Sequence, residues 1–286
     1  MRILLTGGTG YIGSAVLAEL VAAGHEVDAV VRSGASAVAV AELGARAIEG
    51  DLSDAAWLAS ALADVDAAVH AAAPESGADA LNATVVDAAI AAFAGTGKRF
   101  VLTSGVWEFG AGDDLDEDSP LDPPALVAWR VPIEERLLAS GVSATVLAPA
   151  VVYGRDRGIL NIITDPPRTA SGALTLVGDG SQRWTWVHVD DLARLYRIVL
   201  EHPVALGRVL AVDGSSPTVR EVVEAAAGTA GVAAETVEAA RARFGEAFAD
   251  ALLLDQAASG AKARSLGWVP EHASVLDEVE REASAA

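Results

Sequence analysis

The chain has 286 residues, which suffice for one principal hydrophobic core with an added lobe but not for a string of independent modules. Hydrophobic residues make up 52% of it and charged residues 21%, a composition typical of a globular protein and not of a disordered one. Acidic residues outnumber basic ones 40 to 20, and the net charge of -20 repels both phosphate backbones and anionic lipid. We therefore expect no nucleic-acid partner and no membrane partner.

The absence of cysteine excludes disulfides, thiolate metal sites and cysteine nucleophiles. Five scattered histidines remain as the only soft metal ligands, so we predict no metal site. The first residues lack the long apolar stretch of a signal peptide, which predicts a cytoplasmic protein. These counts leave the oligomeric state open.

In the first half of the chain, short apolar runs alternate with stretches of helical periodicity. The apolar runs have the length of buried strands, and the helical stretches would cover a sheet on both faces. This alternation predicts an α/β fold with a doubly wound parallel sheet, the Rossmann fold. The six predicted strands are residues 2–5, 26–31, 46–48, 67–70, 99–102 and 144–147.

The alternation weakens after Gly154, where residues 155–182 carry a Pro-Pro pair and several glycines and are predicted to be loop-rich. The later predicted elements are a helix over 190–200, a strand near 208–212 and a helix opened by the capping-box spacing of Thr218 and Glu221. The C-terminal third is predicted to be mostly helical, and its alanine-rich stretch 239–251 consists of good helix formers. We predict a Rossmann core over residues 1–154 and a smaller, mainly helical substrate-binding lobe over 155–286, with 187–213 returning to the core.

A glycine-rich loop joins the first predicted strand to the first helix. Gly7, Gly10 and Gly13 have the spacing that lets a backbone approach a pyrophosphate, whose charge would face the helix N-terminus. A glycine-rich turn without a ligand is the alternative. The predicted cofactor-binding residues of this loop are Gly7, Thr9, Gly10, Tyr11 and Ile12.

In this loop the sequence begins to resemble the extended short-chain dehydrogenase/reductases, the NAD-dependent epimerase/dehydratase-like family, and the likeness continues over nearly the whole chain. The further landmarks, in order, are Gly50-Asp51-Leu52, residues 69–73, Leu102-Thr103-Ser104, residues 149–154 and residues 187–191. The resemblance implies that Asp51 contacts the adenine amino group, although a helix cap is an alternative role for this aspartate. The further residues that it implies at the cofactor are Leu52, Ala71, Ala72, Ala73, Thr103, Pro149 and Val152.

The end of the second predicted strand bears on the choice of nicotinamide cofactor. NAD enzymes place a carboxylate there for the ribose hydroxyls, whereas this chain has Arg32 and Ser33. A guanidinium and a hydroxyl suit a 2′-phosphate, which a carboxylate would repel. We therefore predict NADP(H), the alternative being that Arg32 is a solvated surface residue.

Most members of this family carry a Tyr-x-x-x-Lys pair on the helix that here spans about residues 125–139. One register places Val127 and Val131 in the two positions, and a second places Trp129 and Ile133 there. The only tyrosines are Tyr11, Tyr153 and Tyr196, and no lysine lies between Lys98 and Lys262. Both registers therefore predict an atypical active site.

Ser104 is the candidate catalytic hydroxyl, although Gly105 occupies the position where the family commonly has its serine. The alternative role of Ser104 is a strand-end hydroxyl that satisfies the backbone. Hydride transfer survives the loss of a general acid better than epimerisation or dehydration, which begin by oxidising an alcohol. The departure from the family pattern thus favours a ketoreductase.

The candidate substrate contacts are mainly aromatic, which suits a flat fused-ring ligand better than a sugar. They are Trp107, Trp129, Tyr153, Arg183 and Trp186. Core packing is the alternative for several aromatics, and Arg183 is in a position where family members that act on sugar nucleotides often hold a diphosphate. The sequence also resembles simocyclinone-type angucyclinone ketoreductases, which act on aromatic polyketides in antibiotic tailoring. A nucleotide-sugar epimerase and a non-catalytic NADP-binding sensor remain as alternatives.

Overall fold

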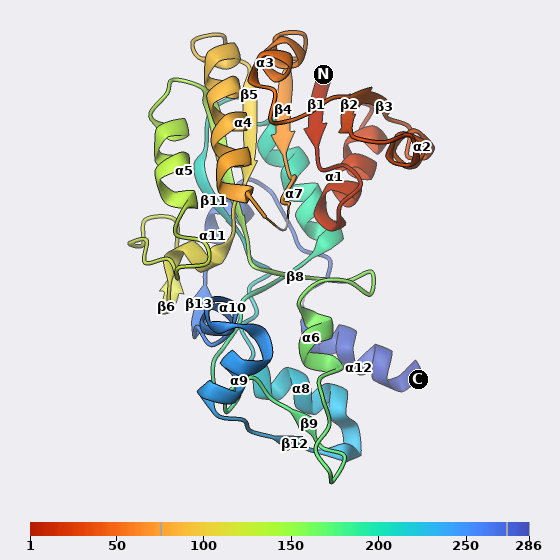
Figure 1. Cartoon of the computed structure of the whole chain (residues 1–286), viewed down its shortest axis with the longest axis vertical. Coiled ribbons are helices and arrows are strands. Elements are labelled where there is room, and N and C mark those ends of the chain that lie inside the picture. Colours follow the sequence, from red (N-terminus) through yellow and green to blue (C-terminus); the bar gives the residue numbers. More distant parts are fainter. Residues whose placement is uncertain (75, 273, 286) are drawn as a thin grey trace. The chain divides into compact units, whose positions relative to one another are not determined.

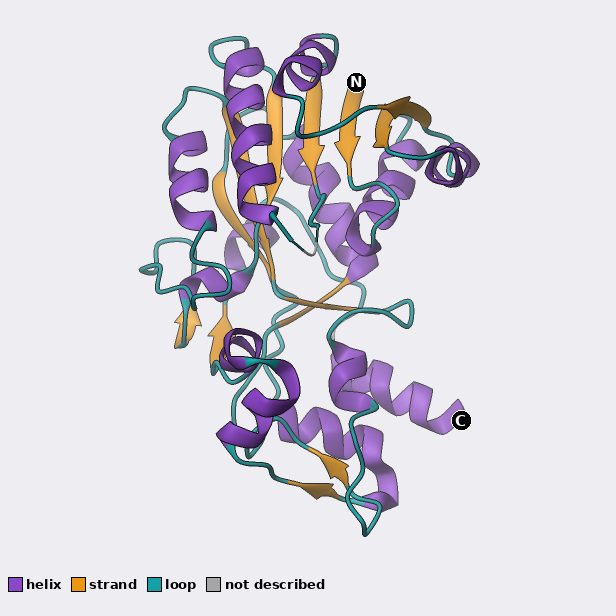
Figure 2. Cartoon of the chain, viewed as in Figure 1, coloured by secondary structure: helices purple, strands orange, loops and turns teal. Residues whose placement is uncertain are grey.

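The computed structural model describes residues 1–74, 76–272 and 274–285, and its elements alternate along the first half of the chain as predicted (Figures 1 and 2). The strands are β1 (Arg2–Thr6), β2 (Glu26–Val31), β3 (Arg46–Glu49), β4 (Ala67–His70), β5 (Arg99–Thr103), β6 (Gly112–Leu115), β7 (Ser143–Pro149), β8 (Val151–Tyr153), β9 (Leu174–Thr175), β10 (Trp186–His188), β11 (Gly207–Ala211), β12 (Val232–Ala233) and β13 (Gln256–Ala258). The helices are α1 (Tyr11–Ala22), α2 (Gly34–Glu42), α3 (Ala55–Ala63), α4 (Ala78–Phe93), α5 (Arg130–Leu138), α6 (Leu160–Thr164), α7 (Val189–Glu201), α8 (Val219–Ala227), α9 (Val237–Phe244), α10 (Glu246–Leu252), α11 (Ala261–Ser265) and α12 (Val275–Ala285), with 3-10 turns η1 (Val106–Phe109) and η2 (Gly228–Ala230).

Seven strands form the main sheet, in the order β11-β7-β5-β4-β1-β2-β3. Neighbouring strands from β7 to β3 pair in parallel. The strand order reverses between β1 and β4, so the connections wind outward from this point in both directions. The prediction of a doubly wound Rossmann sheet is confirmed.

Helices cover both faces of this sheet because its strands are apolar on both sides (Figure 1). On one face α3, α4 and α5 lie side by side over a core that includes Leu4, Phe93 and Phe100. Behind the other face lie α1 and α7, which the ion pair between Arg197 Nε and Glu19 Oε1 links at 2.7 Å. The carboxyl ends of the strands are therefore the part of the sheet that the covering helices leave for a ligand.

The chain divides into two compact units, each built from several segments. Unit 1 comprises Met1–Ser104, Trp129–Ala148 and Leu192–Val209, and unit 2 comprises Gly105–Ala128, Pro149–Asp191 and Leu210–Ala286. The predicted boundary at residue 154 differs from this division, because the segment after β5 and the segment after β7 join unit 2. The segment that returns to unit 1 is also narrower than the predicted 187–213.

Unit 2 contains three two-stranded sheets, in which β8 pairs with β10, β6 with β13 and β9 with β12. Its core contains Trp184 and Trp186, whose ring centroids lie 5.7 Å apart. The capping box of Thr218 and Glu221 opens α8 as predicted. The alanine-rich stretch 239–251 is helical, and Gly245, at φ +81°, separates α9 from α10 within it. No helix in the described part of the chain has the length and apolar character needed to span a membrane.

Candidate cofactor and active site

The loop after β1 lies at the switch point of the sheet, and two of its glycines are required by close backbone contacts. Gly7 has φ +77°, and a Cβ there would lie 2.6 Å from the carbonyl carbon and oxygen of Ala71. A Cβ at Gly13 would collide with the carbonyl oxygen of Gly7. The two glycines therefore let β1, α1 and the chain after β4 approach one another closely.

The N-terminus of α1 is suited to an anion. Gly10, the N-cap residue, makes no side-chain capping bond, and the first turn of α1 carries no acidic residue. Thr9 and Gly10 are exposed, while Tyr11 and Ile12 are half-buried. The partial positive charge at this helix end would stabilise a pyrophosphate. The residues present therefore fit the diphosphate of a nicotinamide dinucleotide.

The chain after β3 gives Asp51 a local hydrogen-bonding role. The exposed Asp51 carboxylate accepts hydrogen bonds from the Ser53 N–H at 2.9 Å and from the Ser53 hydroxyl at 2.7 Å, and these bonds lower the pKa of Asp51. Asp54, not Asp51, caps α3, so the alternative role of Asp51 as the cap is wrong. Leu52 is half-buried against the core of unit 1. The predicted adenine contact of Asp51 stays a prediction.

The predicted residues after β4 and around β8 differ in exposure. Ala71 and Ala72 are half-buried, whereas Ala73 is exposed. Pro149 ends β7 with its side chain buried, and Val152 is half-buried in β8. Their contacts with a cofactor also stay predictions.

Arg32 and Ser33 follow β2 directly. Arg32 is exposed, and its positive charge contributes to the lowered pKa of Asp51. Ser33 caps α2, since its Oγ accepts a hydrogen bond from the Ser36 N–H at 3.3 Å. Its hydroxyl therefore has a structural role that does not require a ligand, while the Arg32 guanidinium extends into solvent.

Ser104 belongs to a buried polar network at the end of β5. Its Oγ donates a hydrogen bond to Oε1 of Glu134 at 2.5 Å, and Oε2 of Glu134 pairs with Nη2 of Arg208 at 3.2 Å. Glu134 is buried on the apolar side of α5, between Ile133 and Leu137. This network favours the structural role of Ser104, because its proton is already directed to a carboxylate. Glu134 was not among the predicted site residues, although an acidic residue beside the apolar face of a predicted helix was a signal.

The helix that carries the Tyr-Lys pair in most of the family begins later than predicted. Its first residue is Arg130, so Val127 and Trp129 precede the helix, and Trp129 is its N-cap. The ring of Trp129 packs against the core of unit 1, and the Arg130 guanidinium lies 5.2 Å from the ring centroid. Val131 and Ile133 lie in the first turn. Packing against the core is thus one established role of Trp129, and its substrate contact stays a prediction.

A pair of hydroxyl groups also lies at the end of β5. Thr103 Oγ1 and Tyr196 Oη are 2.6 Å apart, and Tyr196 comes from α7. Tyr196 is fully buried, and this burial raises the pKa of its phenol, while the bond with Thr103 and the charge of Arg130 act in the opposite direction. Thr103 is half-buried. Tyr196 was not among the predicted site residues, because its partner Thr103 is distant in sequence.

The aromatic residues predicted to contact substrate in unit 2 pack mainly within the core of that unit. Trp186 and Tyr153 have no exposed surface, and their ring centroids lie 6.1 Å apart. Burial raises the pKa of the Tyr153 phenol above its ordinary value. Trp107 is half-buried and contacts Phe248 edge to face at 6.2 Å. These positions favour the core-packing alternative for Trp186 and Tyr153.

Arg183 is held by two carboxylates of unit 2. Its Nε and Nη2 donate to the two oxygens of Asp255 at 2.9 and 2.7 Å, and Nη2 also lies 2.5 Å from Asp113 Oδ1. The two aspartates raise the pKa of Arg183. A substrate diphosphate would have to displace these carboxylates, so the arrangement disfavours the diphosphate role of Arg183.

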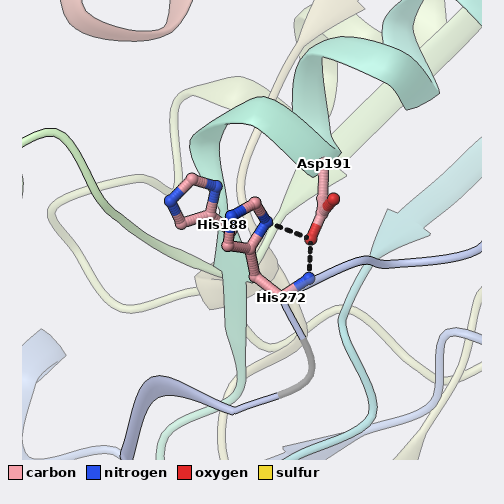
Figure 3. A group of neighbouring side chains, drawn as sticks. All are labelled: His188, Asp191 and His272. Carbon is pink, nitrogen blue, oxygen red and sulfur yellow. Dashed lines mark hydrogen bonds and ion pairs between the residues drawn. The ribbon is translucent and has the colours of Figure 1, made fainter. Parts of the chain in front are cut away.

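His188, Asp191 and His272 form a close group in unit 2 (Figure 3). The two imidazole rings stack with centroids 3.6 Å apart, and burial lowers the pKa of His188, with His272 adding to this effect. The Asp191 carboxylate accepts hydrogen bonds from the N–H of Glu271 at 3.1 Å, the N–H of His272 at 2.9 Å and Nδ1 of His272 at 3.2 Å. Because Asp191 already accepts three N–H donors, the group anchors the segment before α12, and we assign no metal to it.

Comparisons with known proteins agree with this architecture. The model of the NAD dependent epimerase/dehydratase family matches residues 3–212. The 2-alkyl-3-oxoalkanoate reductase of Stenotrophomonas maltophilia is 31% identical, over 70% of this chain and 66% of the relative. The uncharacterized protein YLL056C of Saccharomyces cerevisiae is 27% identical over 98% of both chains.

Two solved structures illustrate the range of this fold. The human epimerase family protein SDR39U1, solved with NADPH, has a TM-score of 0.75 and 22% identity, covering 100% of both chains. The dTDP-glucose 4,6-dehydratase DesIV of Streptomyces venezuelae, solved with NAD, has a TM-score of 0.76 and 25% identity, covering 99% of this chain and 96% of that one. The fold is therefore shared by proteins that bind different nicotinamide cofactors in their structures and have names for different activities.

Proposed function

The chain belongs to the NAD-dependent epimerase/dehydratase family and is related to oxidoreductases, and we propose that it is an NADP(H)-dependent ketoreductase. The observation that carries this proposal is the pairing of Arg183 with Asp255 and Asp113. Arg183 is the residue most suited to a sugar-nucleotide diphosphate, and it is already neutralised within its own unit. A ketone substrate needs no such cation.

The choice of NADP(H) is supported by Arg32. This exposed guanidinium directly follows β2, where an NAD-binding protein places a carboxylate for the ribose hydroxyls. An arginine forms charge-assisted hydrogen bonds with a 2′-phosphate. The human relative SDR39U1, solved with NADPH, is a further support.

Different residues of the chain would bind the diphosphate and the 2′-phosphate of the cofactor. Gly7, Gly10 and Gly13 bring the backbone and the α1 N-terminus to the diphosphate, and Arg32 holds the 2′-phosphate. A bound dihydronicotinamide supplies a hydride to an electrophilic carbon. Neither α5 nor the turn before it contains a tyrosine or lysine, so the alkoxide that results must receive its proton from another group.

An aromatic polyketide substrate has weaker support, because Trp186 and Tyr153, two of its predicted contacts, are core residues. The name of the Stenotrophomonas maltophilia relative, a 2-alkyl-3-oxoalkanoate reductase, suggests 3-oxo acids as a second class of ketone. The epimerase and the non-catalytic sensor remain the competing functions. All of these readings predict binding of a nicotinamide dinucleotide, so turnover must separate them.

The test is NADPH oxidation, followed at 340 nm, against three sets of compounds: polycyclic aromatic ketones, 3-oxo acids and their thioesters, and sugar nucleotides. We expect ketone-dependent oxidation of NADPH, and no interconversion of the sugar nucleotides by chromatography. Sugar-nucleotide conversion without net NADPH consumption would favour the epimerase. Tight NADPH binding with no turnover of any set would favour the sensor.

A further inference from the structure

We propose that Thr103 and Tyr196 form a proton relay that protonates the alkoxide produced by ketone reduction, Thr103 donating to the substrate and Tyr196 supplying Thr103. The inference rests on the proposed ketoreductase function. It also explains how the chain could work without a tyrosine or lysine on α5.

The first support is the position of Thr103. It is the last residue of β5, at the carboxyl edge of the sheet where ligands bind in this architecture. The Thr103 side chain is only half-buried, whereas the neighbouring Ser104 is buried and directs its proton to Glu134. Of these two hydroxyls at the end of β5, Thr103 is therefore the one suited to donate to a ligand.

The second support is the short bond behind Thr103. Its Oγ1 lies 2.6 Å from the phenol oxygen of Tyr196, and either oxygen can donate in this bond. A threonine alone is a weak acid, and its hydroxyl can deliver a proton rapidly only if it receives another one in the same step. The fully buried phenol of Tyr196 occupies the position that such a partner requires.

The third support is the charge of Arg130. The guanidinium at the start of α5 acts to lower the pKa of Tyr196, in opposition to the larger effect of burial. It would therefore stabilise the phenolate that exists after the proton has moved. This is the same electrostatic effect that a cation beside a catalytic phenol provides.

In the proposed step the carbonyl carbon would receive a hydride, with the electron pair of the C4–H bond, from NADPH, which is oxidised to NADP+. The C=O π pair moves to oxygen. That alkoxide takes the Thr103 hydroxyl proton while Thr103 Oγ1 takes the Tyr196 proton, so the product is a neutral alcohol and Tyr196 is left as a phenolate. A proton from water, passed through Thr103, restores the phenol before the next turnover.

A purely structural role is the competing explanation, in which the bond only fixes α7 to β5. We would compare Tyr196→Phe, Thr103→Val and the double variant with the unmodified chain, using a ketone that the unmodified chain reduces. Thr103→Ser keeps the hydroxyl, and Thr145→Val is a matched control that removes a buried hydroxyl from the neighbouring strand β7. The readouts are kcat, KM, NADPH affinity by calorimetry and the melting temperature.

The relay predicts that Tyr196→Phe and Thr103→Val each lower kcat on the order of 100-fold, the lower range for a positioned acid. In Tyr196→Phe, whose phenol is fully buried, NADPH affinity should change by less than about twofold. The double variant should fall no further than the single ones, because the two hydroxyls act as one unit. Thr103→Ser should retain most of the activity, and Thr145→Val should have the same kcat as the unmodified chain.

A kcat within about twofold of the unmodified chain in Tyr196→Phe would overturn the relay, as would losses that multiply in the double variant. A lowered melting temperature with unchanged kcat would establish the structural role in its place. If the unmodified chain reduces no ketone although it binds NADPH, the proposed function fails, and the relay fails with it. The activity of the unmodified chain therefore distinguishes the two failures.

Discussion

Different interactions stabilise unit 1 and unit 2, each within itself. Unit 1 is a sheet of neighbouring parallel strands, whose cofactor loop is shaped by direct contacts between backbone atoms, as at Gly7 and Gly13. In the part of unit 2 that the structure describes, the sheets are two-stranded, and buried or half-buried polar side chains join distant segments: Asp191 binds the N–H groups before α12, and Arg183 binds Asp255. Local sequence thus specifies the glycine loop of unit 1, whereas polar pairs distant in sequence join the segments of unit 2.

The largest expected effect is that of Gly13→Ala on unit 1. The added Cβ would collide with the carbonyl oxygen of Gly7, a backbone atom that cannot rotate away. NADPH affinity measured by calorimetry should fall at least on the order of 100-fold, which corresponds to about 2.7 kcal/mol. Gly34→Ala is the control, since a Cβ there meets nothing within 4 Å. Unchanged affinity in Gly13→Ala would contradict the assignment of the loop.

The stability of unit 1 and the stability of unit 2 should also change with pH in opposite directions. Burial lowers the pKa of His70 in unit 1 to about 4, so on acidification the unfolded chain takes up the proton first. The stability that the neutral His70 contributes is full above about pH 6.5 and falls as the pH drops toward 4. Burial raises the pKa of Asp213 in unit 2 to about 7. Its contribution is therefore full below about pH 4 and is lost as the pH rises through 7.

Amide hydrogen exchange can follow the two units separately at pH 5 and pH 8. At pH 8, Asp213→Asn should raise the free energy of opening of unit 2 above that of the unmodified chain by on the order of 1 to 3 kcal/mol. At pH 5 this difference should be smaller. His70→Gln should reduce the loss of protection of unit 1 between pH 8 and pH 5. A pH profile of unit 2 that does not change in Asp213→Asn would contradict the role of this carboxylate.

A smaller effect is expected for Arg32→Asp, because Arg32 is exposed and solvent screens its charge. The ratio of NADPH to NADH affinity should fall by roughly 10-fold to 50-fold, since an aspartate repels the 2′-phosphate and accepts from the ribose hydroxyls. Arg168→Asp makes the same change in net charge from unit 2 and should leave the ratio unaltered. Equal affinity of the unmodified chain for the two cofactors would refute the role of Arg32.

The smallest effect is expected for Asp255→Asn in unit 2. The variant keeps the shape of the side chain but weakens the three hydrogen bonds that Asp255 accepts from Arg183, whose side chain is partly exposed. Unit 2 should lose about 1 kcal/mol of stability by hydrogen exchange, and NADPH affinity should not change. A loss of NADPH affinity comparable to that of Gly13→Ala would show that the two units do not respond separately.

The contrast between local patterns and pairs distant in sequence explains what the sequence could predict. The strands of the main sheet, the glycine loop and the α8 capping box depend on residues that are close in sequence, so their patterns predicted them. The partners of Ser104, Tyr196 and Arg183 lie 30, 93 and 72 residues away. No local periodicity reports such pairs, and the roles of these three residues therefore required the structure.

Two features show the limits of residue type as a signal. The alanine-rich stretch 239–251 consists of good helix formers, and residue type did not show that Gly245 takes a backbone conformation that ends α9. The aromatics near strand ends predicted a substrate surface, but Trp186 and Tyr153 fill the core of unit 2, because large rings are also what a small core requires. Residue type alone could not distinguish these two uses.

The central claim is that the chain transfers hydride from NADPH to a ketone, and isotope transfer tests it most directly. The reaction would use NADPH deuterated at C4 and the ketone with the highest turnover, and the alcohol product would be analysed by mass spectrometry and NMR. We predict one deuterium on the carbinol carbon from one of the two C4-deuterated epimers, with none at that carbon from deuterated water. No labelled alcohol from either epimer, or a label that comes from solvent, would contradict the account.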